Sequence, residues 1–474
     1  DSIPRLPHPT RRQHGANLMQ IRIFAVSAIL GLAGSGACYA EDLIQIYDLA
    51  VQSDPILKKA EQDLYATREV KPQARAILLP QLGIGVDADY YNDRSDGVST
   101  VGSGRRNDTY NTTELRAGVS QTIYNRGDWI TLKQTDDTIA QADALYRDAQ
   151  IELMVRTTKT YFKDDLSRGG VLRAADLVRV QESLLRANER QLEQSRQRFE
   201  VGLVAITDVN ESQAAYDRSR ADLINAENAL DNAWEALRRI VGPISVPLAR
   251  LGAKLPLAPP EPNDIDQWVK TALDNNYGII AAREAADSAK KQIEIARSGH
   301  YPIVTLQAGY NSRRTGAEFG TDLDRGFVGL NLELPIYQGG AVTSRTREAG
   351  YDLGAAQESL DNARREVVEG VKNAFRGVIS SISDVQARQA AIVSARSALE
   401  STQAGLEVGT RTQVDVLNAQ RSLFETEFEY LSARYDYIFR GVELHQATST
   451  LTRDVLVKGN AWLDPDDLVV PPSY

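Results

Sequence analysis

The feature that most constrains the fold is a motif of twelve residues that occurs twice, at 199–210 and at 406–417. In both copies a Val-Gly pair precedes an Asp-Val pair, and long segments with helical periodicity lie on either side. Glycine adopts positive φ after a helix end at little cost, so each copy predicts the tip of a long antiparallel helical hairpin. We expect Thr207 and Asp208 to cap the first returning helix and to complement its dipole. Two ordinary helix caps would be a simpler interpretation, but the duplication disfavours coincidence.

Apolar residues recur at intervals of seven around both motifs, which predicts coiled-coil packing of the long helices. In the first half the helical pattern continues from Gly127 to Glu200, which corresponds to a length of about 110 Å. The positions three residues after the apolar ones are small or polar, which favours a wide assembly around a wet interior over a dry two-stranded rod. These positions are Ala174, Gln181, Asn188, Ser195, Ser212, Ser219, Ala226 and Ala233.

Two segments in each half alternate with period two, as strands with one apolar and one polar face do. In the first half a polar loop is expected from Asn92 to Asn111, between the two strands. Closed membrane barrels start at eight strands and open edges are not tolerated in lipid, so four strands cannot form such a barrel alone. Lipid-facing strands would therefore require several chains to share one barrel, and the strand number allows two, three or four copies.

The order of these elements predicts two internal structural repeats. Six of the 17 prolines lie between the repeats, which indicates a linker there. The last segment has no strong period and is expected to be a surface tail or disordered. The predicted boundaries are 41–242 for repeat 1 (hairpin at about 80–124, long helices and tip at 127–241), 243–263 for the linker, 264–452 for repeat 2 (hairpin at about 302–336, long helices and tip at 340–451) and 453–474 for the tail.

Residues 19–40 have the pattern of a secretory signal peptide. Arg22 precedes a short apolar run, and small residues follow as far as Ala40. The run is too short for a permanent transmembrane helix. Residues 1–18 lie upstream and are interpreted as a leader or an artefact outside the fold. Lipidation at Cys38 is an alternative, but the leucine expected three residues before it is absent.

Composition argues against catalysis and against nucleic acid as a partner. The net charge is −10, and Cys38 is the only cysteine, so after the leader no thiol nucleophile or cysteine metal site is available. Gly339-Gly340 lacks the lysine and serine of a phosphate-binding loop. We therefore expect no enzymatic activity, no catalytic residues, no metal site and no cofactor.

Taken together, these features resemble the TolC family of outer-membrane channels over essentially all of residues 41–451. The matching motifs are Leu79-Pro80-Gln81-Leu82, Pro335-Ile336-Tyr337-Gln338-Gly339-Gly340, the segment 201–209 and Val408-Gly409-Thr410-Arg411. The resemblance implies an α+β membrane protein, a homotrimer in which four strands per chain form a 12-stranded β-barrel among the lipids of the outer membrane. A long 12-helix α-helical barrel would continue from it through the periplasm.

The resemblance also implies a function. The family provides the exit duct of type I secretion and tripartite multidrug efflux systems, a passive channel that is opened at its periplasmic tip. A periplasmic adaptor (membrane fusion) protein and an inner-membrane ABC or RND-type pump are the implied partners. A secreted soluble coiled-coil scaffold is the alternative; it accounts for the heptads but leaves the alternating hairpins unexplained.

The same resemblance assigns a periplasmic gate to the tips. Arg411 would be the cation of a latch, with Thr207 and Asp208 as its partners, and Asp415 would form an acidic constriction ring. Asn418 stands where close relatives have a second aspartate, so three carboxylates per trimer are expected, not six. Alternatively, Arg411 and Asp415 form only a local pair worth about 0.3–0.5 kcal/mol, and the glycines only terminate helices. The residues implied to contact the adaptor are Gly202, Leu203, Gly409 and Thr410.

Overall fold

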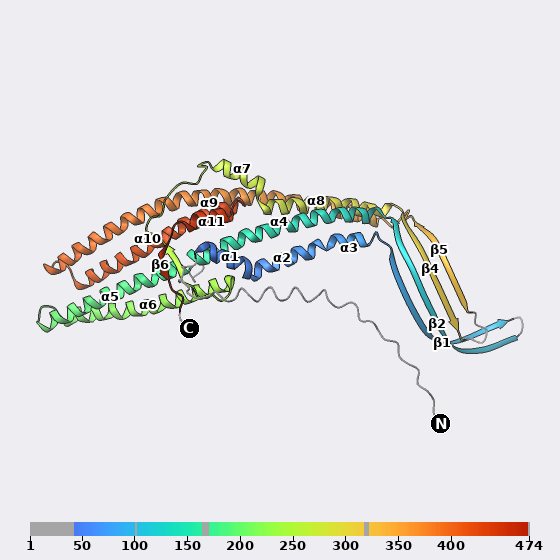
Figure 1. Ribbon diagram of the computed structural model, residues 1–474, viewed down its shortest axis with the longest axis horizontal. Helices are drawn as coiled ribbons and strands as arrows, with labels where there is room; N and C mark the ends of the chain where they lie inside the picture. The colour runs from blue at the N-terminus through green and yellow to red at the C-terminus, as the bar shows by residue number, and fades with distance from the viewer. Residues whose placement is uncertain (1–41, 100–101, 164–169, 317–321, 473–474) are drawn as a thin grey trace, which may run out of the picture.

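A four-stranded antiparallel sheet forms one end of the elongated molecule, and two helical hairpin tips form the other (Figure 1). The computed structural model describes residues 42–99, 102–163, 170–316 and 322–472. The expected leader at 1–18, the signal peptide at 19–40 and Cys38 lie outside the described residues. The strands are β1 (Gln81–Ser99), β2 (Gly102–Tyr124), β4 (Ile303–Thr315) and β5 (Leu323–Glu333).

The sheet has the strand order β1-β2-β4-β5, so β1 and β5 are its edges. The pairing of β2 with β4 joins the two predicted hairpins. The prediction of a loop from Asn92 to Asn111 is wrong, because β1 and β2 continue to pair there and Asn92 lies opposite Thr109. This extension of the hairpin is rich in polar residues, so the apolar alternation that identifies a strand from sequence is missing, although the backbones still pair.

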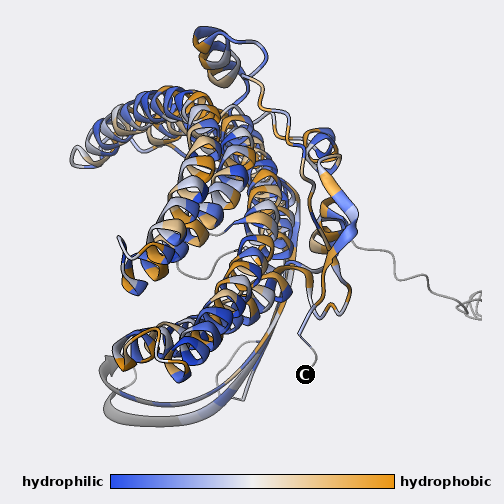
Figure 2. Ribbon diagram, turned by 90° about the vertical axis from the view of Figure 1, so that its left-hand side faces the viewer, coloured by the Kyte–Doolittle hydropathy of each residue, from blue (hydrophilic) through white to orange (hydrophobic). Residues whose placement is uncertain are grey.

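Long helices extend from the sheet to the tips. They are α4 (Arg126–Phe162), α5 (Val171–Glu200), α6 (Ile206–Val241), α8 (Tyr277–Arg297), α9 (Ala341–Glu407) and α10 (Gln413–Ala447). The 67 residues of α9 correspond to about 100 Å. Viewed from the tips, the long helices lie in a curved layer, with hydrophilic and hydrophobic residues mixed along them (Figure 2). Among the described residues, no helix combines the length and the apolar character that crossing a membrane requires.

The predicted unbroken helix from Gly127 to Glu200 is wrong. Helix α4 ends at Phe162, where Lys163 has extended backbone angles, and α5 begins only after Gly170. A Cβ atom on Gly170 would lie 2.3 Å from the backbone nitrogen of Lys163, so only glycine fits at this position. The break was missed because the segments on both sides of it are helical and no proline separates them.

A belt of short elements surrounds the middle of the helices. It contains α1 (Leu43–Ser53), β3 (Leu248–Leu251), α7 (Ile265–Asn275), α11 (Arg453–Asn460) and β6 (Leu463–Val469). Two further helices, α2 (Pro55–Arg68) and α3 (Val70–Ala76), continue along α4 toward the sheet, and the 3-10 helix η1 (Ser298–His300) joins α8 to β4. Of the two alternatives for the tail, disorder is wrong over α11 and β6, because β6 pairs with β3 of the linker and Leu456 and Val469 are buried. The short helix and the short strand carry too few residues to give a periodic signal.

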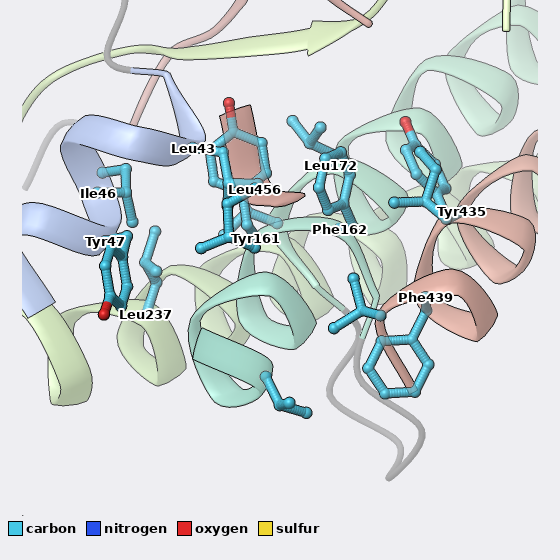
Figure 3. Packing of buried hydrophobic residues seen from close by; sticks show 14 of the residues in the cluster. Leu43, Ile46, Tyr47, Tyr161, Phe162, Leu172, Leu237, Tyr435, Phe439 and Leu456 are labelled. Carbon is cyan, nitrogen blue, oxygen red and sulfur yellow. The ribbon is translucent and has the colours of Figure 1, made fainter. Parts of the chain in front are cut away.

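The main core lies where this belt meets the helices. Tyr161 and Phe162 at the end of α4 pack among side chains from α1, α5, α6, α10 and α11 (Figure 3). The hydroxyl of Tyr161 donates a hydrogen bond to the carbonyl of Ala249, 2.8 Å away. Asp176 of α5 is also buried here, and it contacts Arg250 of β3 and Tyr435 of α10. The core therefore joins elements from both halves of the chain.

Candidate functional site: the two hairpin tips

The first tip connects α5 to α6 through a turn that depends on one glycine. Gly202 has φ of +74°, and its amide donates to the carbonyl of Phe199 at 2.9 Å. The amide of Leu203 donates to the carbonyl of Arg198 at 2.8 Å, which closes the end of α5. The Leu203 side chain is 74% exposed. This tip therefore presents an apolar side chain to the surroundings.

The returning helix of the first tip is capped differently from the prediction. Its N-cap is Ala205, and no side chain accepts a hydrogen bond there, so the expected capping by Thr207 is wrong. Thr207 and Asp208 lie one and two residues inside the helix, which begins at Ile206. Asp208 does lie in the first turn, where a carboxylate complements the helix dipole. The turn is longer than the sequence pattern indicated, because Val204 and Ala205 still belong to it.

The second tip connects α9 to α10 and has the same glycine geometry. Gly409 has φ of +78°, and the amides of Thr410 and Arg411 both donate to the carbonyl of Gly405, at 2.8 and 3.2 Å. A Cβ atom on Gly405 would lie 2.6 Å from Cγ of Arg411. The stem of Arg411 therefore lies against a glycine of α9, while the residue as a whole is exposed.

A capping box begins α10. The hydroxyl of Thr412 accepts from the amide of Asp415 at 3.2 Å, and the Asp415 carboxylate accepts from the amide of Thr412 at 2.9 Å. The hydrogen bonds that the amide and the hydroxyl of Thr412 donate to the Asp415 carboxylate, and more weakly the charge of Arg411, lower the pKa of this carboxyl. Thr412 was missed at the sequence level, although the pattern Thr-x-x-Asp is a recognised start of a helix.

The five proposed gate residues all lie at or near the tips, but the single chain does not bring them into contact. Thr207, Arg411 and Asn418 are exposed, and Asp208 and Asp415 are half-buried. Within the part of the chain that the structure describes, Arg411 makes no ion pair and no side-chain hydrogen bond with Thr207 or Asp208. A link between these groups therefore requires another copy of the chain or a movement of the tips.

A set of buried or half-buried polar side chains joins the second hairpin to the first. The side-chain amide of Gln413 of α10 donates to the hydroxyl of Ser212 at 3.0 Å and accepts from the side-chain amide of Gln191 at 3.1 Å. One heptad further, Gln420 donates to the carbonyl oxygen of the Asn188 side chain at 2.9 Å. We call this set the polar seam; its residues are Asn188, Gln191, Ser195, Ser212, Gln413 and Gln420. The sequence pattern had identified Asn188, Ser195 and Ser212 as small or polar core positions, but it gave no sign of the two glutamines that bind them.

Replacing Thr412 with alanine is expected to destabilise the start of α10 by about 1 kcal/mol, because the cap is lost. The depressed pKa of Asp415 has a related consequence: its stabilising effect is present above the pKa of the unfolded chain and is lost as the pH falls through the folded value. Hydrogen exchange of the Asp415 amide measures both effects as a loss of protection. Asp208 of the uncapped first tip is the internal control, and equal protection in wild type and variant would contradict the capping role.

Comparison with known proteins places this geometry in context. The family model described as outer membrane efflux protein matches residues 46–243 and 268–450. The outer membrane protein TolC of Vibrio cholerae is 39% identical over 448 residues, which covers 92% of this chain and 97% of that protein. The alkaline protease secretion protein AprF of Pseudomonas aeruginosa is 27% identical over 407 residues, with 84% and 82% covered.

A solved structure has a similar fold. The CmeC outer membrane channel of Campylobacter jejuni superposes with a TM-score of 0.71 and covers 97% of this chain and 98% of that chain. The sequence identity is 15%, so this likeness concerns the fold alone.

Proposed function

Because the chain belongs to the outer membrane efflux protein family, in which its resemblance to TolC is confirmed, we propose that it is the outer-membrane exit duct of type I secretion and tripartite multidrug efflux systems. In this role it is a passive channel, with its sheet in the outer membrane and its helices in the periplasm. A periplasmic adaptor and an inner-membrane ABC or RND-type pump supply the specificity and the energy. The observation that carries the proposal is an exposed apolar face on the sheet, at the end of the molecule opposite the tips.

This face is formed by alternate residues of the edge strands. Leu82 and Ile84 of β1 are 79% and 74% exposed, and Val328 and Leu330 of β5 are 79% and 71% exposed. The residues between them are polar or glycine, such as Asn331. An apolar face of this kind is unfavourable in water but favourable against lipid tails, where the opposite face lines an aqueous interior.

The open edges of the sheet support an assembly of several copies. Strands β1 and β5 each have one unpaired side, and unpaired backbone groups are not tolerated in lipid. Pairing β5 of one chain with β1 of the next removes every edge. We propose three copies, as the family resemblance implies, which gives a barrel of 12 strands that continues into a barrel of 12 helices. The two hairpins with their long helices are then two structural repeats of one unit.

We further propose that the tips form the periplasmic gate. Arg411 of one protomer links to Thr207 and Asp208 of its neighbour, and Asp415 forms a ring of three carboxylates, with Asn418 one turn further along the helix. Such a ring favours cations over anions. Arg411 is exposed and, among the described residues, its side chain does not contact Thr207 or Asp208 of its own chain, which supports a link between protomers. The adaptor contacts Gly202, Leu203, Gly409 and Thr410 at the outermost turns.

Two substitutions at neighbouring positions of β5 test the membrane assignment. Leu330→Arg places a charge on the lipid face, where it costs about 2–4 kcal/mol near the middle of the bilayer. Asn331→Arg places the same charge on the opposite face. We expect Asn331→Arg to yield a detergent-solubilised particle of three chains that conducts ions in planar bilayers, and Leu330→Arg to fail to insert.

The alternative function makes different predictions for the same pair. A soluble coiled-coil scaffold would remain dispersed in plain buffer, would not conduct, and would tolerate both arginines equally. A well-behaved single chain in buffer without detergent would therefore reject the channel.

A further inference from the structure

The polar seam lies on the face of α10 that is buried against the first hairpin. Gln413, Val416, Gln420 and Leu423 of α10 are all buried, so amides and apolar side chains alternate at heptad spacing. Val416 and Leu423 supply the apolar contact that any coiled coil needs. The two glutamines are what distinguish this seam from an apolar one.

Three of the seam's side-chain amides are buried and hydrogen-bonded, and that of Gln191 is half-buried. Gln413, Gln420 and Asn188 are each 5% exposed. Ser212 is completely buried, and its hydroxyl lies 3.0 Å from both the side-chain nitrogen of Gln413 and the hydroxyl of Ser195. Burying such groups without hydrogen bonds would cost free energy, so the side chains of the two hairpins depend on one another.

A hydrogen-bonded polar pair among apolar core residues adds little to the free energy of unfolding, but it determines how the two helices are aligned. Apolar side chains tolerate small sliding and separation, whereas an amide at a core position accepts only the register in which its partners lie. Here the partners differ along the seam: Gln413 meets Ser212 and Gln191, and Gln420 meets Asn188. The second hairpin therefore has one favoured position along the first.

We propose that Gln413 and Gln420 are positioning residues that hold the second hairpin in register with the first and thereby set the separation of the two tips. Gln413 directly follows the N-cap Thr412, and both Arg411 and Asp415 lie within two residues of it. Fixing the Gln413 amide thus fixes the location of the proposed gate groups relative to Asp208. This role in gating rests on the proposed function, whereas the effect on the tips does not.

The distance between the tips tests the proposal directly. Spin labels at Leu203→Cys and Thr410→Cys, in a Cys38→Ser background, report the separation of the tips in detergent by pulsed electron paramagnetic resonance. We expect Gln413→Ala and Ser212→Ala to shift the distance distribution to longer values and to broaden it. Gln420→Ala is expected to do the same to a smaller extent, because its contact lies further from the tip.

Ser219→Ala is the matched control. Ser219 is buried on α6 one heptad from Ser212, but its hydroxyl donates only to the carbonyl of Tyr216 in the same helix. We expect this variant to keep the parent distribution. The proposal is overturned if Gln413→Ala and Ser212→Ala also keep it, or if Ser219→Ala shifts it equally.

The measurement needs neither conductance nor an adaptor, so it separates the two proposals. A protein that forms no channel but shows the expected distance changes would reject the proposed function and retain the positioning role. A protein that conducts ions, but whose tip distances are unchanged by the substitutions in the polar seam, would retain the proposed function and reject the positioning role. The circular dichroism of each variant at the temperature of the experiment verifies that the helices are intact.

Discussion

Replacing Arg411 with alanine is expected to raise the mean current through the channel in planar bilayers. An exposed ion pair contributes up to about 1 kcal/mol, and the latch would occur three times in a trimer. Losing about 3 kcal/mol from the closed state raises the ratio of open to closed channels about 100-fold. Asp208→Ala removes the partner of the same link and is expected to act in the same direction.

Arg421→Ala is the matched control for the latch. Arg421 lies on α10, in the same hairpin as Arg411, and is exposed, but its guanidinium pairs locally with Glu425 at 2.8 Å. Removing it changes the charge of this hairpin by the same amount without altering the turn at the tip. If Arg411→Ala and Asp208→Ala both conduct like wild type, the tips hold no latch.

The second large effect is expected in the belt, where Asp176→Ala should destabilise the protein by about 3 kcal/mol. One carboxylate oxygen of Asp176 lies 2.7 Å from the guanidinium of Arg250, and the other accepts from the hydroxyl of Tyr435 at 2.6 Å. Burial, reinforced by the Asp176 charge, keeps the pKa of Tyr435 well above its ordinary value. Alanine would leave the largely buried guanidinium and the hydroxyl without this partner.

Asp467→Ala provides the comparison. Asp467 of β6 also pairs with Arg250, at 3.2 Å, but its side chain is half exposed. Its loss is expected to cost less than about 1 kcal/mol. Urea unfolding of the helices, followed by circular dichroism in detergent, measures both variants. Equal midpoints for Asp176→Ala and Asp467→Ala would show that the buried carboxylate has no special role in joining the elements.

Periodicity and glycine position predicted the skeleton of this fold. The heptads identified the long helices, and Gly202 and Gly409 marked both turns, because a turn that needs positive φ leaves a visible glycine. The alternation of apolar residues identified the four strands of the sheet. The extension of the hairpin beyond Asn92 was missed because apolar and polar residues alternate only where the two faces of a strand differ, and here both faces are polar.

The residues around the tips were harder to predict, since their roles depend on partners distant in sequence. Gln413 appeared as an ordinary polar residue at the start of a helix, yet its hydrogen bonds cross to Ser212, 201 residues away. The break at Gly170 was missed because the segments on both sides of it are helical. A link between protomers such as that proposed for Arg411 is not visible in any single chain.

The pairing of β3 with β6 has a consequence for the order of folding. Strand β6 comes late in the sequence, and Arg453 of α11 also pairs with Asp48 of α1, 405 residues earlier. During synthesis from the amino terminus, these contacts can therefore form only after almost the whole chain has been made. Until then the belt that holds the long helices together is incomplete, so the proposed assembly of several copies would follow its late completion.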